Sequence, residues 1–397
     1  MNALPSPVKW LGRVALGLGI VAIIAAVVVS RIVGNIDAQM NPVAPHEPWP
    51  VSAEARALHD TLMVADLHAD TLLWGRDPAK RHERGQTDLP RFREGGMFLQ
   101  VFGAVTKSPE GQNYEENSAA AGDRITLLAM AQGWPPATWG SLEARAAYQA
   151  QRLQRLAKKD DAFFLVRTKS DLGTALAARA ENPEAMAGIL ATEGSHALEG
   201  DLDAIDRLYA EGYRVMGFHH FFDNALGGSL HGQSGEGLSD FGRAALAAME
   251  EKGIIFDVAH SSEAVVRDVL ALTDRPVILS HTGIDSACPS PRNVSDELMS
   301  RIAERGGLIG IGFWADAICD DTPAGIARMI AHAVSRFGED HIALGSDFDG
   351  SVPTTIDASE LAAITHALLQ VGLSPTQIEK VMGGNQIRFF MSQLPEA

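Results

Sequence analysis

Cysteine and basic residues are scarce in this chain, and each scarcity excludes a class of protein. Only two cysteines, Cys288 and Cys319, occur among 397 residues. This excludes a disulfide-dense scaffold and a cysteine-rich zinc cluster, and it leaves open whether the two form one disulfide or remain buried thiols. The chain has 50 acidic and 33 basic residues, for a net charge of −17, which argues against nucleic acid or anionic lipid as a binding partner.

Phosphate-binding motifs and long repeats are missing as well. Neither G-x-G-x-x-G nor G-x-x-x-x-G-K-[ST] follows any predicted strand, so nucleotide-binding versions of an open doubly wound sheet lose support. No solenoid-type repeat is visible. The composition, with 46% hydrophobic and 21% charged residues, is that of an ordinary globular protein with one large domain or two small ones.

An uncharged and strongly apolar run, Val14–Ser30, lies near the N-terminus between two arginines. With a few flanking residues it approaches the ~20 needed to span a bilayer. No A-x-A-like cleavage site follows it, so an uncleaved anchor is favoured over a chain secreted after signal cleavage. We therefore predict a cytoplasmic stub and transmembrane anchor over 1–34, a proline-rich linker over 35–52 and a domain over 53–397. Basic residues before the run favour an inner-membrane protein whose domain faces the periplasm or exterior.

After the linker, short apolar strands alternate with longer amphipathic helices. Extra helices at Glu116–Gln132 and Leu142–Lys159 follow the second strand, and two helices, Ser359–Gln370 and Pro375–Met382, close the chain. This pattern predicts a (β/α)8 TIM barrel with extra helices; a doubly wound open sheet is the main competitor. The eight predicted strands are Leu62–Leu67, Met97–Ala104, Ala187–Thr192, Tyr213–His219, Ile254–Ala259, Pro276–Ser280, Leu308–Phe313 and Ile342–Gly345.

Residue types that bind metals stand at the ends of these strands. In VADLHAD, two such residues are separated by one position, and on an extended backbone positions i and i+2 point to the same side. The C-terminal ends of barrel strands meet in one mouth, so we predict a shared metal site there. The residues at or just after these strand ends are His68, Asp70, Glu193, His220, His260, His281 and Asp347.

Three histidines and two acids exceed the needs of one tetrahedral zinc, which suggests two metals. A carboxylate such as Glu193 can bridge two cations and hold a hydroxide nucleophile between them. Asp347 is placed to take and return the proton. Arg292, in a loop after the sixth strand, could clamp a carboxylate bidentately.

Several neighbouring residues keep two interpretations. His219 and His220 are adjacent in sequence, so at most one of them faces the mouth. Asp257 is either a partner of a metal ligand or merely paired, and Asp349 is interpreted as part of a structural turn. Other histidines gain no support from their positions: His46, His59, His82, His196, His231, His332, His341 and His366.

Seven motifs, in this order, resemble the membrane (renal) dipeptidase family of the amidohydrolase superfamily: DLHAD, TEGSHAL, HHFFDN, FDVAHSS, ILSHTG, PRN and GSDFDG. The resemblance runs from about Leu62 to Asn385 and implies a barrel with two zinc ions per subunit. By this resemblance, His68 and Asp70 would bind the first zinc, Glu193 would bridge, and His260 and His281 would bind the second. His220 would contact the substrate carbonyl or its tetrahedral intermediate, Arg292 the terminal carboxylate, and Asp347 the proton and the free amino group.

The function predicted from this resemblance is hydrolysis of dipeptides, small substrates that in bacterial relatives often carry a D-residue on the C-terminal side. The alternatives are an amidohydrolase acting on N-acyl amino acids or a lactam, and a tethered binding protein without catalysis. The last is disfavoured because every matching position holds a competent residue. The mammalian C-terminal lipid anchor and disulfide pattern are not evident, and side-chain preference, stereochemistry, native metal and oligomeric state, with a homodimer among the options, stay open.

Overall fold

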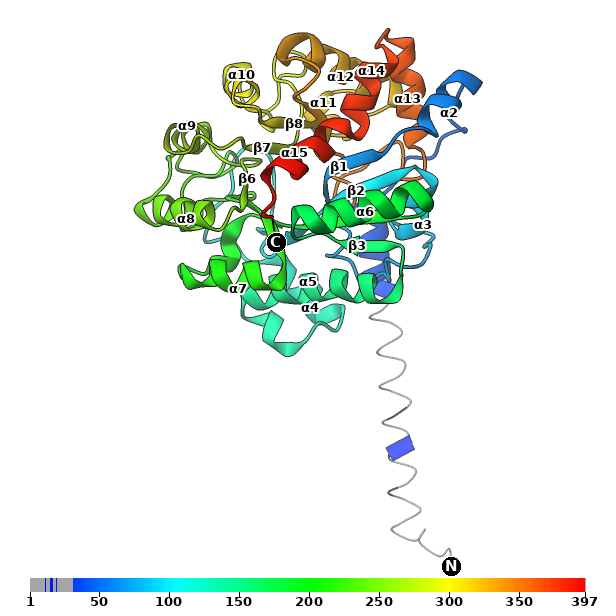
Figure 1. The fold of residues 1–397 in the computed structure, drawn as a ribbon. Helices are drawn as coiled ribbons and strands as arrows, with labels where there is room; N and C mark the ends of the chain where they lie inside the picture. The colour runs from blue at the N-terminus through cyan, green and yellow to red at the C-terminus, as the bar shows by residue number, and fades with distance from the viewer. Residues whose placement is uncertain (1–10, 12–14, 17–18, 20–30, 397) are drawn as a thin grey trace, which may run out of the picture.

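The computed structural model describes residues 11, 15, 16, 19 and 31–396 (Figure 1). The predicted membrane run, Val14–Ser30, thus lies outside the described residues except at three positions. Within the described part of the chain, no helix combines the length and apolar character needed to cross a membrane.

Eight parallel strands form a closed barrel. Their pairing order is β2-β1-β9-β8-β7-β6-β5-β4, and β2 also pairs with β4, which closes the ring. The predicted (β/α)8 barrel is confirmed, and the open doubly wound sheet is excluded because the ring has no free edge. The strands are β1 (Val64–Ala69), β2 (Met97–Val105), β4 (Met186–Glu193), β5 (Tyr213–Gly217), β6 (Ile255–Asp257), β7 (Ile278–Thr282), β8 (Leu308–Ile311) and β9 (Ile342–Leu344). A short accessory strand, β3 (Phe163–Leu165), pairs with the start of β4.

Helices surround the barrel, and extra ones follow β2 (Figure 1). The predicted helix at Glu116–Gln132 begins only at Arg124, because Asp123 caps it by accepting from the Ile125 amide. The helices are α2 (Ala53–His59), α3 (Leu89–Glu94), α4 (Arg124–Ala131), α5 (Leu142–Lys159), α6 (Lys169–Glu181), α7 (Asp203–Glu211), α8 (Asp240–Glu251), α9 (Glu263–Leu272), α10 (Asp296–Glu304), α11 (Ala315–Ile318), α12 (Pro323–Phe337), α13 (Leu361–Gln370), α14 (Pro375–Glu379) and α15 (Asn385–Gln393).

The last helix, α15, was not predicted. The chain does not end its helical part with the predicted Pro375–Met382 but turns at Gly383 and continues as α15. A Cβ at Gly383 would lie 1.8 Å from the Met63 carbonyl oxygen, so glycine permits a close approach to the start of β1. Phe389 and Phe390 of α15 then join Leu67 and other strand residues in one buried cluster.

Residues 31–40 form a helix that packs against the barrel, so the stretch predicted as a linker, 35–52, begins inside a helix. Asp37 is buried there, and one of its carboxylate oxygens lies 2.9 Å from Nε of both Arg76 and Arg84. Farther along, the Ala44 amide donates to the Thr354 carbonyl at 2.7 Å. This segment is therefore fixed to the barrel near the loop that follows β9.

Candidate metal centre and active site

The first two predicted ligands lie at the end of β1. His68 is in the strand and Asp70 follows it, held in place where its amide donates to the Phe348 carbonyl at 2.9 Å. His68 Nε2 lies 3.4 Å from Asp70 Oδ1 and 3.4 Å from Glu193 Oε1. Both side chains are buried. The end of β1 therefore presents an imidazole and a carboxylate to Glu193.

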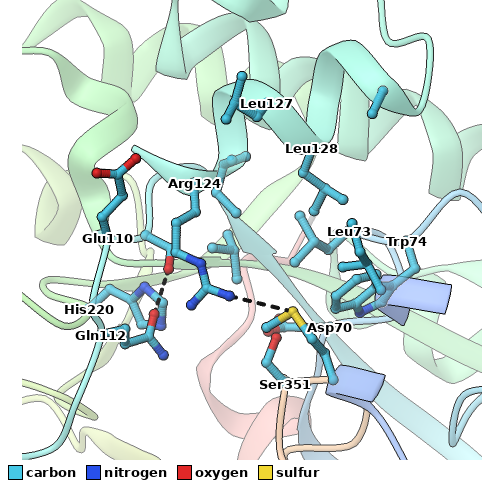
Figure 2. A pocket seen from close by; sticks show the side chains of 17 residues that line it. Asp70, Leu73, Trp74, Glu110, Gln112, Arg124, Leu127, Leu128, His220 and Ser351 are labelled. Atoms are coloured by element: carbon cyan, nitrogen blue, oxygen red, sulfur yellow. Dashed lines mark hydrogen bonds between the residues drawn. The ribbon is translucent and has the colours of Figure 1, made fainter. Parts of the chain in front are cut away.

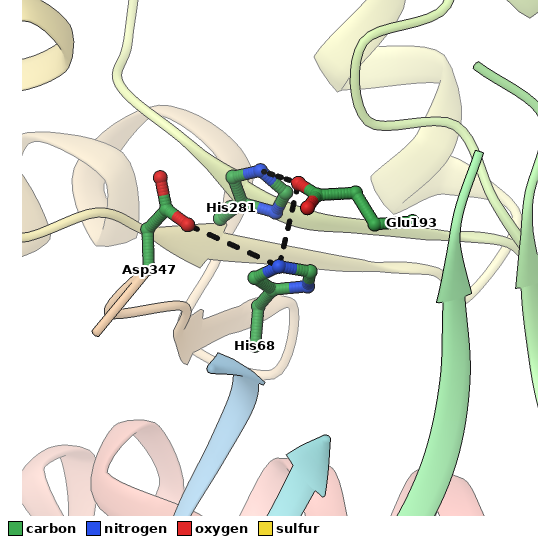
Figure 3. A group of neighbouring side chains, drawn as sticks. All are labelled: His68, Glu193, His281 and Asp347. Carbon is green, nitrogen blue, oxygen red and sulfur yellow. Dashed lines mark ion pairs between the residues drawn. The ribbon is translucent and has the colours of Figure 1, made fainter. Parts of the chain in front are cut away.

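Glu193, the last residue of β4, reaches into the site and contacts several imidazoles, of which Figure 3 shows His68 and His281. Its Oε1 is 3.2 Å from His260 Nε2 and 3.4 Å from His281 Nε2, in addition to the contact with His68. Its Oε2 is 3.6 Å from His220 Nε2. One carboxylate thus contacts imidazoles from four separate parts of the barrel.

Two sets of these side chains could each hold a metal ion, with all ligand atoms of a set within 4.8 Å of one another. One set is His68, Glu193, His281 and Asp347, and the other is Glu193, His220 and His260. Glu193 belongs to both. This grouping places His281 with His68, whereas the family resemblance pairs His281 with His260. The Nε2 atoms of His260 and His281 are 3.0 Å apart.

The chemistry of these groups fits a cation. His68 Nε2, Asp70 Oδ1 and Glu193 Oε2 are buried without a hydrogen-bond partner, and such unpaired polar atoms are costly unless something compensates them. A divalent metal held by this cluster would compensate such atoms. The residues present therefore fit the metal centre predicted from the sequence.

The protonation states point the same way. Burial, reinforced by the nearby Arg292 guanidinium, lowers the pKa of His260 well below its usual value. Burial alone would raise the pKa of Glu193, but the charges of His220 and His68 and the hydrogen bonds from other imidazoles lower it well below the ordinary range. Burial opposes a raised pKa at His68, yet the Glu193 and Asp70 carboxylates raise it well above normal. The carboxylates thus favour a positive charge in this space.

Asp257 and Ser280 orient His281. Ser280 Oγ donates to Asp257 Oδ2 at 2.6 Å and lies 2.8 Å from His281 Nδ1. Because the serine proton is used on Asp257, the hydroxyl oxygen must accept from Nδ1–H, which leaves the Nε2 lone pair free to bind a metal. Of the two interpretations left open for Asp257, the structure thus supports the one in which it acts through a metal ligand.

We expect Ser280→Ala to weaken metal binding by about 10- to 100-fold, since loss of the orienting partner of a ligand has effects of this size. A competition titration with a chelator measures this affinity. Ser286→Ala is the matched control, because its hydroxyl donates to Asp296 at the same 2.6 Å but lies on an exposed loop. An unchanged affinity in Ser280→Ala would show that the hydroxyl does not orient the ligand.

Arg292 lies buried beside the metal centre, where the His281 carbonyl and the Trp314 ring hold its guanidinium. Its Nη2 donates to the His281 carbonyl at 2.8 Å, and its guanidinium stacks 5.4 Å from the Trp314 ring. Its Nε is buried without a partner. Burial lowers its pKa, although an arginine stays charged at neutral pH. The free donor makes Arg292 suited to binding a carboxylate next to the metals.

A disulfide stabilises the loop that carries Arg292. Cys288 is joined to Cys319, which decides between the two states that the sequence left open. Asn293, next to Arg292, donates through Nδ2 to the Cys288 and Ala317 carbonyls at 2.9 Å each. The loop is therefore tied to the segment after β8.

Asp347 follows β9 and faces the centre from the opposite side. Its Oδ1 is 3.9 Å from His68 Nε2 (Figure 3). Burial, together with the Glu193 and Asp70 carboxylates, raises its pKa well above the usual range, so this carboxyl group can hold a proton. Both Asp347 and His260 have a left-handed backbone, with φ of 58° and 60°, a conformation that costs energy in non-glycine residues and is found often at functional sites.

Only one of the adjacent histidines faces the centre. His220 Nε2 approaches Glu193, and its Nδ1 lies 3.3 Å from the Lys107 carbonyl. His219 instead lies 3.2 Å from Ser261 Oγ, and burial lowers its pKa to about 4.

Asp349, the residue interpreted as part of a structural turn, makes structural contacts. It accepts from the Gln86 amide at 2.8 Å and pairs with Arg76 Nη2 at 2.8 Å.

The position of His231 in the sequence does not indicate a site residue, yet His231 lies at the site. It is fully buried, its ring is 5.4 Å from that of His260, and its Nδ1 is 2.9 Å from the Tyr114 carbonyl. The Tyr114 hydroxyl in turn accepts from Trp314 Nε1 at 2.9 Å. These residues come from loops, where no strand periodicity marks them, so only the fold reveals them.

A closed parallel barrel with buried imidazoles and carboxylates at the C-terminal ends of its strands defines a barrel metallohydrolase. Residues 52–394 match the family model described as membrane dipeptidase, peptidase family M19. The chain therefore belongs to this family. The resemblance seen in the motifs is confirmed, and so is the predicted enzyme class, a metallo-dipeptidase.

Individual relatives agree with this assignment. The chain is 27% identical over 336 residues to the dipeptidase ataJ of Aspergillus terreus, which covers 77% of this chain and 76% of that protein. It is 25% identical to the dipeptidase tcpJ of Claviceps purpurea, covering 90% and 80%. A crystal structure titled dipeptidase AC, a metallopeptidase of family M19, has a TM-score of 0.67 at 25% identity, covering 85% of this chain and 100% of that one.

Proposed function

We propose that this chain is a zinc-dependent dipeptidase with two ions per subunit, held by His68, Asp70, Glu193, His260 and His281. The observation that carries this proposal is the position of Glu193. Its carboxylate contacts ligand atoms of both candidate sets, as a bridging ligand must. A bound pair of such ions would polarise the scissile carbonyl and acidify the attacking water.

The side chains around the centre would hold the two ends of a dipeptide. Arg292, with its free Nε, would bind the terminal carboxylate beside His260 and His281. Asp347 would bind the free amino group and carry the proton, from the attacking water to the departing amine. Recognition of both charged ends limits the substrate to two residues, because a longer peptide would place an uncharged amide where one end must bind.

His220 would hydrogen-bond the carbonyl oxygen of the scissile bond. The Lys107 carbonyl can only accept, so His220 Nδ1 is the donor in that contact. Its Nε2 can therefore donate to substrate only when the imidazole is protonated. The Glu193 carboxylate 3.6 Å away favours that state, although burial lowers the pKa of His220.

A substrate panel tests the proposal. Purified full-length chain is loaded with zinc, its metal content is measured, and it is assayed on dipeptides with L and D C-terminal residues, on N-acyl amino acids and on a lactam. We expect two zinc ions per chain and hydrolysis of dipeptides. N-acyl amino acids keep the carboxylate for Arg292 but offer no amine to Asp347, so a preference for them would replace the dipeptidase assignment with the amidohydrolase alternative. Metal-loaded protein that cleaves none of the panel would contradict both.

We also propose that the domain faces the periplasm or exterior from an inner-membrane anchor. The uncharged run Val14–Ser30 supports an anchor, and the Cys288–Cys319 disulfide supports an oxidising compartment. Fractionation with protease treatment of intact spheroplasts tests this. Release into the medium would favour secretion after signal cleavage, and protection inside spheroplasts would contradict the orientation.

A further inference from the structure

An apolar cavity opens beside the metal centre (Figure 2). It has a volume of about 330 Å³, at the small end of the range for ligand sites. Asp70 and His220 line its inner end, and Leu73, Trp74 and Leu128 are among the residues of its walls. The space is therefore continuous with the reaction centre and suits an apolar group.

The position of the cavity determines which part of a dipeptide could enter it. Gly350 and Ser351, just after Asp347, line one side, whereas Arg292 is not among the lining residues. Arg292 lies by His260 and His281, with its Nη2 3.5 Å from His260 Nε2. A substrate whose carboxylate is bound by Arg292 would thus direct its amino-terminal residue, which is one residue farther along, toward Asp70 and the cavity.

Part of the wall comes from outside the family domain. Ile36 and Met40 line the cavity, and both precede residue 52, where the family match begins. They are four positions apart on the 31–40 helix, so they lie on one face. Arg124 of α4 contacts Met40, with Nη2 3.6 Å from Sδ (Figure 2).

Buried ion pairs hold this helix in place. Asp37, between the two lining residues, pairs with Arg76, and Arg76 pairs with Asp349 at 2.8 Å. Asp349 is two positions from Asp347. The N-terminal helix is therefore attached to the same loop that carries a residue of the site, which gives the cavity a fixed outer wall.

We propose that this cavity binds the side chain of the substrate's amino-terminal residue and selects a large aliphatic one, and that Ile36 and Met40 contribute to the selection. The proposal rests on the dipeptidase function proposed above. An apolar wall stabilises an aliphatic side chain by excluding water, whereas a charged side chain would lose hydration against a wall in which only a few polar groups, such as Glu110 and Arg124, could pair with it. A glycine at this position would leave the cavity without substrate contacts.

The test compares three dipeptides on the zinc-loaded full-length chain: Leu-Ala, Gly-Ala and Ala-Leu, with the C-terminal configuration that the panel shows to be active. We expect kcat/KM for Leu-Ala to exceed that for Gly-Ala by about 100-fold or more, and to exceed that for Ala-Leu, because even one methylene in such a pocket is worth roughly tenfold or more. Comparable values for the three would overturn the cavity assignment while leaving the dipeptidase function intact. No cleavage of any dipeptide would overturn both.

A variant identifies the contribution of the N-terminal helix. The double variant Ile36→Ala, Met40→Ala should lower the Leu-Ala to Gly-Ala ratio by about tenfold. Ile32→Ala is the matched control, because Ile32 is on the same helix, is 52% exposed and is not a lining residue; its ratio should equal that of the wild type. A double variant with an unchanged ratio, or a control with an equal loss, would overturn the role of these two residues. The wild-type substrate series decides on the cavity even if the double variant does not fold.

Discussion

Replacing Glu193 by alanine is expected to remove bound metal and to lower kcat/KM for dipeptides by about 10³-fold or more. The reason is geometric. Glu193 Oε1 lies within 3.4 Å of three imidazole nitrogens, on His68, His260 and His281, so its loss affects both candidate metal sets at once. Elemental analysis of the purified variant, together with steady-state kinetics, measures the two losses.

The matched control is a carboxylate at the opposite end of β4, the strand that ends at Glu193. Glu184 precedes β4, and its side chain is 65% exposed where it approaches Arg93. Glu184→Ala removes a carboxylate without touching the metal centre, so metal content and kinetics should match the wild type. Full metal content or wild-type turnover in Glu193→Ala would contradict the bridging assignment. Thermal unfolding of both variants separates a loss of metal from a loss of fold.

Replacing Arg292 by alanine is expected to raise KM for dipeptides by about 100-fold, with a smaller change in kcat. A charge-assisted hydrogen bond to a carboxylate contributes roughly 1.5–3 kcal/mol, and 1.4 kcal/mol corresponds to a factor of ten. The loss should fall on KM because the terminal carboxylate is held equally before and during the reaction. The KM of Arg292→Lys should lie between those of the wild type and Arg292→Ala, since an ammonium keeps the charge but not the bidentate geometry.

The control for Arg292 is a change in the substrate. A dipeptide amide lacks the terminal carboxylate, so its hydrolysis should be slow with the wild type and only slightly slower with Arg292→Ala. Equal losses on the acid and the amide would instead indicate that Arg292 acts by supporting His281, whose carbonyl it contacts at 2.8 Å. The two substrates therefore separate carboxylate binding from a structural role.

Sequence patterns predicted the barrel because its strands are short apolar runs between amphipathic helices. Several boundaries were close: α5 spans the predicted Leu142–Lys159, and β2 is one residue longer than predicted. Errors arose where a tertiary contact overrode a local signal. The helix predicted from Glu116 begins only at Arg124, where Asp123 caps it and pairs with Arg145 of α5. Gly383 follows the predicted helix Pro375–Met382. Its missing side chain allows close packing on β1, and the chain continues into α15.

The sequence by itself determined which residue types stand at the strand ends, and a parallel barrel necessarily collects those ends in one mouth. The candidate ligands from His68 to Asp347 therefore follow from the sequence. Only the tertiary structure decided how loops and the N-terminal helix complete the site. His231, the Cys288–Cys319 disulfide and the apolar cavity depend on contacts between segments distant in the chain, and such contacts leave no periodic signal in the sequence.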